Sequence, residues 1–60
     1  MSKARFWVGQ RVTVRLWEGE PVERDGRIEG VGRSTLLVLF EGFFDSVVVF
    51  RAAVIWEEEK

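Results

Sequence analysis

The 60-residue chain contains neither cysteine nor histidine. Disulfide bonds, thiolate nucleophiles, zinc sites built from these residue types and the Ser-His and Cys-His catalytic pairs are therefore excluded. No uninterrupted apolar run is longer than residues 36–40, whereas a helix that spans a bilayer needs ~20 apolar residues. The N-terminus also lacks the apolar region of a secretory signal. We expect no metal, no cofactor and no membrane contact, and a cytoplasmic location.

The sequence also has no large excess of charge of either sign. Nine basic and ten acidic residues give a formal charge of −1, so no overall field draws the chain to nucleic acid or anionic lipid. A hydrophobic share of 47% with 32% charged residues is typical of a folded domain. Because a chain of this length encloses only one small core, we predict one domain over residues 1–60, with an acidic tail over 57–60.

The order of apolar residues predicts five short strands. Residues 11–17 alternate strictly, with Val12, Val14 and Leu16 on one face, which is the signature of a half-buried strand. Residues 18–21 contain a glycine and the only proline, so a long first loop should begin there. The other strands are expected over residues 24–31, 35–41, 45–51 and 54–56, with one helical or 3₁₀ turn over 51–54.

Two glycines of the second predicted strand, Gly26 and Gly30, lie on one face together with Ile28. Repeated glycines on one face let a strand bend sharply or let another backbone approach closely. Five strands, a long first loop and a single turn before the last strand together predict an all-β fold, a five-stranded SH3-like small barrel.

The third and fourth predicted strands are apolar on both faces. Only one face of each strand can point into the single core, so the other face needs a cover from outside the domain. A second copy of the chain is the simplest cover. We therefore predict a homo-oligomer whose interface is formed by Leu37, Leu39, Val48 and Phe50.

The chain has eight aromatic residues, which is more than so small a core can enclose. Phe40 and Trp56 are expected in the core, whereas Trp17 falls on the outward register of the first strand and Phe44 lies in a turn. Exposed Trp and Phe side chains are typical of contact surfaces. We predict that a protein or peptide ligand would meet Trp17, Arg24, Arg27 and Phe44.

The arginines allow a second interpretation. Arg24, Arg27, Arg33 and Arg51, with an aromatic platform, could bind single-stranded nucleic acid through phosphates and stacked bases. Arginines interleaved with acidic residues also form solvated cross-strand ion pairs, and this interpretation stays open beside the first.

No pair of residues indicates catalysis. Asp45 beside Ser46, or Glu18 near Glu20, provides a carboxylate without the nucleophile and orienting base that a catalytic site needs. We expect a binding module that is not an enzyme.

Three segments resemble the plasmid-encoded type II dihydrofolate reductases, at residues 6–12 (FWVGQRV), 25–30 (DGRIEG) and 46–57 (SVVVFRAAVIWE). Those enzymes are SH3-like barrels that assemble as tetramers around a pore. The resemblance places the pore-lining Val-Gln-Ile-Tyr stretch of the family on residues 47–50.

The resemblance also marks where polar groups of the family are missing. Val48 stands in place of the ligand-holding glutamine, Phe50 in place of the tyrosine, and Val14 in place of a cationic lysine. It therefore implies a non-catalytic relative whose corresponding surface is an interface, with an NADPH-dependent reductase as the alternative.

Weaker resemblances point to other small barrels. Residues 16–19 (LWEG), 26–28 (GRI) and the block from Val47 to Ile55 are similar to Sm-like proteins, although the Asp and Asn of their RNA-binding loop have no counterpart near residues 31–34. Gly-x-Ile patterns of this kind also recur in Tudor, KOW and integrase C-terminal barrels.

Overall fold

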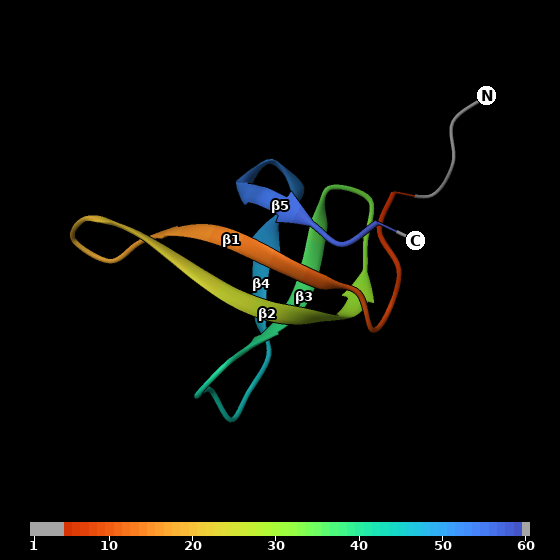
Figure 1. Cartoon of the computed structure of the whole chain (residues 1–60), viewed down its shortest axis with the longest axis horizontal. Helices are drawn as coiled ribbons and strands as arrows, with labels where there is room; N and C mark the ends of the chain where they lie inside the picture. The colour runs from red at the N-terminus through yellow and green to blue at the C-terminus, as the bar shows by residue number, and fades with distance from the viewer. Residues whose placement is uncertain (1–4, 60) are drawn as a thin grey trace.

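The computed structural model describes residues 5–59, which form one antiparallel sheet (Figure 1). Its elements are β1 (Arg11–Trp17), β2 (Pro21–Val31), β3 (Thr35–Phe40), β4 (Val47–Phe50), the 3₁₀ turn η1 (Arg51–Ala53) and β5 (Val54–Glu57). The strand order is β4-β3-β2-β1-β5. The predicted all-β class, the five strands and the single turn before the last strand are confirmed.

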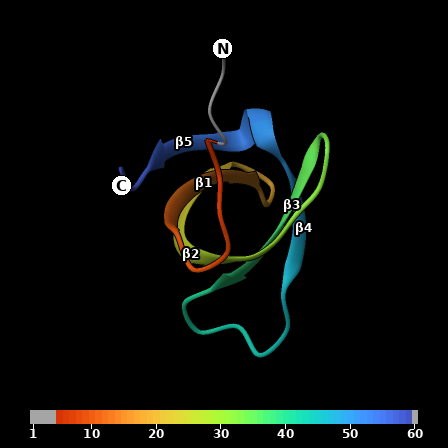
Figure 2. The same ribbon diagram turned by 90° about the vertical axis from the view of Figure 1, so that its right-hand side faces the viewer.

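The sheet curls around one interior, with η1 connecting its two edge strands (Figure 2). Within residues 5–59 no strand pairing joins β4 to β5, so the sheet is open. The closure that the predicted barrel requires is therefore not confirmed. The same part of the chain contains no helix long and apolar enough to cross a membrane.

The expectation of a long first loop is wrong, because β1 and β2 form a tight hairpin. Their pairing runs without interruption from Arg11 opposite Arg27 to Trp17 opposite Pro21. The turn is closed by the Glu18 N–H, which donates to the Glu20 carbonyl at 2.9 Å. Gly19 has a φ of +82°, a conformation that glycine adopts without steric cost.

The sequence pattern did not predict the hairpin, because the hairpin extends beyond the core, on the left of Figure 1. No residue of β2 before Ile28 is fully buried, so this half of the strand has no alternating apolar pattern to reveal it. Pro21 is tolerated because it is the first residue of β2, a position where proline is found in sheets.

Alternate residues of the strands build the core. Its apolar members are Phe6, Val12, Val14, Ile28, Leu36, Val38, Phe40 and Val49. Phe40 is buried as expected. Trp56 is not, with 54% of its surface exposed.

The position of Trp56 follows from a register shift between β1 and β5. Val54 lies opposite Val14, but the shift places Trp56 opposite Thr13, on the outer face. Without it Trp56 would lie opposite Val12 and point inward. The aromatic place in the core is taken by Phe6, which lies beneath the guanidinium groups of Arg5 and Arg51, each 5.3 Å from the ring centroid.

The glycines of β2 have different roles. A Cβ on Gly26 would lie 2.7 Å from Val38 Cγ1 and 2.9 Å from the Leu39 carbonyl oxygen, so a close backbone approach does require glycine here. A second register shift, between Ile28 and Gly30, places Gly30 opposite Leu37 on the outer face. The expectation that Gly30 shares a face with Ile28 is therefore wrong. Such bulges bend a strand.

The predicted acidic tail is partly integrated in the sheet. Glu57 is the last residue of β5 and accepts a hydrogen bond from Arg5 Nε at 2.7 Å. The Glu58 N–H donates to the Arg11 carbonyl at 2.9 Å. Lys60, the end of that predicted tail, lies outside the described residues.

Candidate functional site

The outer face of β3 and β4 carries the four residues of the predicted interface. Leu37 lies directly opposite Val48, and Phe50 lies opposite Thr35. Val48 and Phe50 are exposed over 66% and 69% of their surfaces and Leu37 over 38%, whereas Leu39 is half-buried. We call Leu37, Leu39, Val48 and Phe50 the outer strip.

These side chains cannot turn inward, because the interior beneath them is already filled. Leu36, Val38 and Val49, the neighbours of the strip on the same two strands, are all buried. Side chains of adjacent residues in a strand point to opposite faces. The outer strip is thus an apolar surface fixed in an exposed position by the packing of the opposite face.

A shallow apolar groove adjoins the strip at Phe50. It has a volume of about 490 Å³ and lies between the β1–β2 hairpin and the η1–β5 segment. Its lining residues are Arg15, Trp17, Phe50, Ala52, Ala53 and Ile55. We call it the hairpin groove. It extends the exposed apolar surface from β4 to the hairpin.

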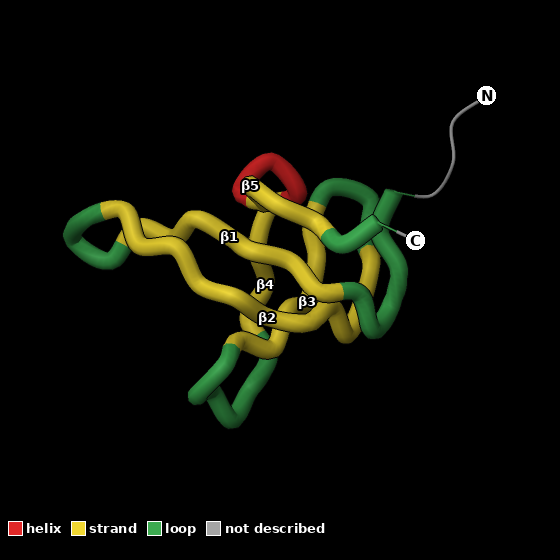
Figure 3. Tube along the Cα trace, viewed as in Figure 1, coloured by secondary structure: helices red, strands yellow, loops and turns green. Residues whose placement is uncertain are grey.

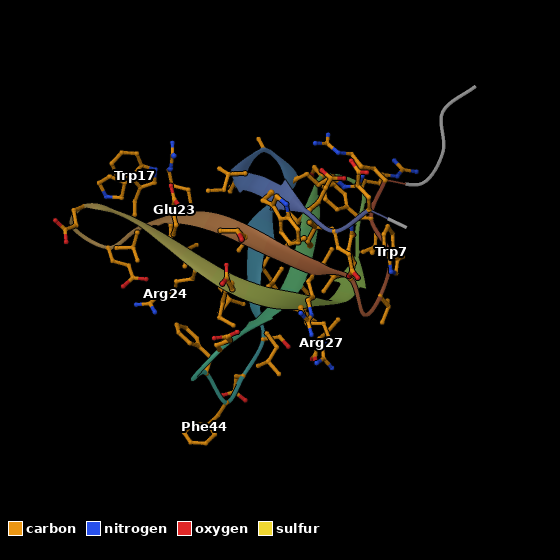
Figure 4. The ribbon with its side chains drawn as sticks, in the orientation of Figure 1. Trp7, Trp17, Glu23, Arg24, Arg27 and Phe44 are labelled. Atoms are coloured by element: carbon orange, nitrogen blue, oxygen red, sulfur yellow. The ribbon has the colours of Figure 1, made fainter. Side chains whose placement is uncertain are left out.

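The four predicted ligand residues are not brought together. Trp17 lies near the tip of the hairpin and Phe44 at the tip of the loop between β3 and β4, and the two side chains point away from each other (Figure 4). Figure 3 shows that these two loops project from the sheet in different directions. Phe44 is fully exposed and Trp17 is exposed over 76% of its surface.

Arg24 is engaged within the hairpin. Its Nε and Nη2 donate to the two carboxylate oxygens of Glu18 at 3.0 and 3.2 Å. The guanidinium also lies 5.4 Å from the centroid of the Phe43 ring. Chiefly through this hydrogen bonding, Arg24 lowers the pKa of the Glu18 carboxyl, and Glu18 in turn raises the pKa of Arg24.

Arg27 lies on the outer face and lines a different groove. It is directly opposite Arg11 across the β1–β2 ladder, and within residues 5–59 neither guanidinium forms an ion pair. The groove has a volume of about 770 Å³, and its lining also includes Leu39 and Trp56. Acidic residues line it as well, namely Asp25, Glu29 and Glu41.

The remaining cross-strand contacts on this face are ordinary surface pairs. Arg15 Nη2 is 3.1 Å from Glu23 Oε2, and Thr13 Oγ1 donates to Asp25 Oδ1 at 2.7 Å. Arg15 and Arg24 therefore form solvated ion pairs, as the alternative interpretation of the arginines expects. Among the described residues no three acidic side chains converge to hold a metal ion.

Comparison of the chain with protein-family models, with curated proteins and with solved structures finds no match. Four lining residues of the hairpin groove were not predicted, namely Arg15, Ala52, Ala53 and Ile55. The signal that could have found Ile55 is the run of apolar residues 52–56, which exceeds what one short strand can bury.

Proposed function

We propose that the chain is an SH3-like interaction domain, not an enzyme, that binds a second copy of itself through the outer strip. The observation that carries this proposal is the exposure of Val48 and Phe50 on a sheet whose opposite face is already packed. Contiguous apolar surface of this kind is typical of protein interfaces.

The SH3-like assignment is supported by the order of the elements. A sheet ordered β4-β3-β2-β1-β5, with one 3₁₀ turn before the last strand, is the arrangement that the predicted fold requires. The non-catalytic assignment is supported by the apolar side chains of Val48 and Phe50, at the positions where the resemblance to type II dihydrofolate reductases would place polar ligand contacts.

The expected affinity follows from the buried surface. Complete burial of a Val, Leu or Phe side chain contributes about 1.5–3 kcal/mol. Scaled by the exposures of Leu37, Val48 and Phe50, covering these side chains on two copies contributes about 5–10 kcal/mol. Association costs about 4–15 kcal/mol in lost translational and rotational freedom. We therefore expect weak association that depends on protein concentration.

Sedimentation velocity from micromolar to millimolar concentration tests this proposal. We expect the mean sedimentation coefficient to rise with concentration, and Val48→Lys to abolish the rise by placing a charge within the strip. Val8→Lys is the matched control, because Val8 is exposed to nearly the same extent, 65% against 66%, and lies outside the strip. A wild-type chain that stays monomeric at millimolar concentration would contradict self-association.

A second candidate function, binding of single-stranded nucleic acid, is favoured by the opposed Arg11 and Arg27. Like charges directly opposite each other in a sheet are destabilising unless an anion neutralises them, and Trp56 offers an exposed ring in the same groove. The acidic residues of the groove lower its attraction for phosphates.

Fluorescence polarisation with a labelled oligonucleotide tests this candidate. Binding through phosphates must weaken as salt is raised and must be reduced by Arg27→Gln. Binding without dependence on salt, or unaffected by that substitution, would exclude it.

A further inference from the structure

β4 is an exposed sheet edge that carries no charge, no proline and no bulge. It hydrogen-bonds with β3 alone, and no strand lies on its other side within the described part of the chain. Its four residues, Val-Val-Val-Phe, include no charge and no proline, and its register with β3 is regular. Natural edge strands normally carry a charge, a proline or a bulge that discourages pairing with another chain.

The hydrogen-bond pattern shows which backbone groups this edge offers. The Arg51 N–H donates to the Ser34 carbonyl of the neighbouring chain segment at 3.0 Å. Residues of an antiparallel ladder alternate between those that face the partner strand and those that face away. Val49 and Val47 therefore face β3, and the N–H groups of Val48 and Phe50 point outward, along with the Val48 carbonyl.

We propose that two copies pair antiparallel along β4 about a two-fold axis, with Val48 of each copy opposite Phe50 of the other. The two sheets then become one continuous sheet, and the outer strips of both copies lie side by side on the same face. This inference specifies the geometry of the self-association proposed above and rests on it.

The register follows from two constraints. A two-fold axis perpendicular to the sheet maps the outer face onto the outer face, so residues of the same face must lie opposite each other. Centring on Val49 pairs Val48 with Phe50, both apolar, and lets the Phe50 N–H of each copy donate to the Val48 carbonyl of the other. Centring on Val48 would instead place Phe50 opposite Ser46, whose hydroxyl already donates to Glu29 Oε1 at 2.8 Å.

The other edge of the sheet explains why pairing stops at two copies. β5 contains the register shift between Val54 and Trp56, and its last residue, Glu57, is held by Arg5. A bulge and a charged end discourage further strand addition. Pairing along β4 therefore removes the one regular apolar edge and gives a closed dimer.

Cysteine cross-linking tests the register directly, because the chain has no cysteine of its own. We would prepare Val48→Cys and Phe50→Cys separately and oxidise each alone and in an equimolar mixture. In the proposed pairing the opposite Cα atoms are about 5.5 Å apart, within the range of a disulfide. Identical positions are about 8–9 Å apart, which is beyond that range.

We expect a disulfide-linked dimer in the mixture and no such dimer when either variant is oxidised alone. Cross-linking of Val48→Cys with itself would overturn the register. No cross-link in any sample, from a protein that still associates in sedimentation, would overturn edge pairing while leaving self-association through the outer strip intact. A wild-type chain without association would remove both proposals.

A proline substitution tests the role of the edge by a separate route. Val48→Pro deletes an N–H that points away from β3, so the fold, checked by circular dichroism, should be retained while association is lost. Val48→Thr keeps both the N–H and the branched shape and should still associate. Equal association of the proline variant and the wild type would show that the β4 backbone is not the contact.

Discussion

At the scale of single residues, Gln10 is the least expected member of the interior. It is completely buried, and its side-chain amide is fully hydrogen-bonded. Nε2 donates to the Glu58 and Arg5 carbonyls at 2.8 and 3.4 Å, and Oε1 accepts from the Trp7 N–H at 3.2 Å. One polar side chain thereby connects the N-terminal segment to the end of β5.

Replacing Gln10 by leucine should therefore destabilise the fold although it adds apolar volume. The change removes the hydrogen bond that Nε2 donates to the part-buried Glu58 carbonyl, at a cost of about 1–3 kcal/mol. Urea denaturation measures this as a lowered midpoint with an unchanged slope. Glu20→Ala, in the exposed hairpin turn, should change the free energy of unfolding by less than about 0.5 kcal/mol. Equal stability of Gln10→Leu and wild type would show that these hydrogen bonds are replaced by water.

The Glu18–Arg24 pair predicts a pH effect. Arg24 lowers the pKa of Glu18 in the folded state, so the pair stabilises the fold above the unfolded pKa of Glu18. That stabilisation is lost as pH falls through the lower, folded pKa. NMR titration of the Glu18 carboxyl should give a pKa below its ordinary value, which Arg24→Gln raises and Arg15→Gln leaves unchanged. An unchanged pKa in Arg24→Gln would contradict the pairing.

At the scale of elements, β2 depends on the close approach of β3 at Gly26. Gly26→Ala should destabilise the domain by about 1–3 kcal/mol, because the added methyl meets a backbone oxygen as well as Val38. Gly30→Ala is the matched control on the same strand, since its Cβ would meet only Leu37 Cβ, at 3.3 Å, and the end of that side chain. The melting temperature of Gly26→Ala should be clearly lower than that of Gly30→Ala. The reverse order would disprove the close approach.

The strands were predictable from sequence where they border the core. Strict alternation located β1 to the residue, and the apolar runs located β3, β4 and β5 within two residues of their observed ends. The first half of β2 was not predictable, because a hairpin that leaves the core carries polar residues on both faces. The two register shifts were also invisible, since a bulge changes the face of Gly30 or Trp56 without changing the sequence pattern.

The candidate site was likewise predictable from the sequence only in part. The exposed positions of Val48 and Phe50 could be predicted, because adjacent apolar residues in a strand cannot share one small core. The separation of Trp17 from Phe44 could not, since Trp17 ends β1 near the tip of the hairpin, Phe44 lies in the loop between β3 and β4, and the directions of these two projections depend on how the sheet folds. The hairpin groove was missed because its lining residues come from β1, β4, η1 and β5, and only the folded sheet brings these segments together.

At the scale of the whole molecule, self-association should couple stability to concentration. A second copy that binds only the folded state stabilises it by mass action, so the melting temperature should rise with protein concentration. Val48→Lys should remove this dependence, whereas Val8→Lys should keep it. Differential scanning calorimetry over a concentration series measures the effect, and a melting temperature of the wild type that does not vary would argue against the dimer.

The contacts of Arg5 with Glu57 and of Gln10 with Glu58 bring the two ends of the described part of the chain together. A short flexible linker could therefore fuse residue 59 to residue 5, and the chain could be reopened in the projecting loop over 41–46. Such a circular permutant would keep every strand pairing and would begin with β4.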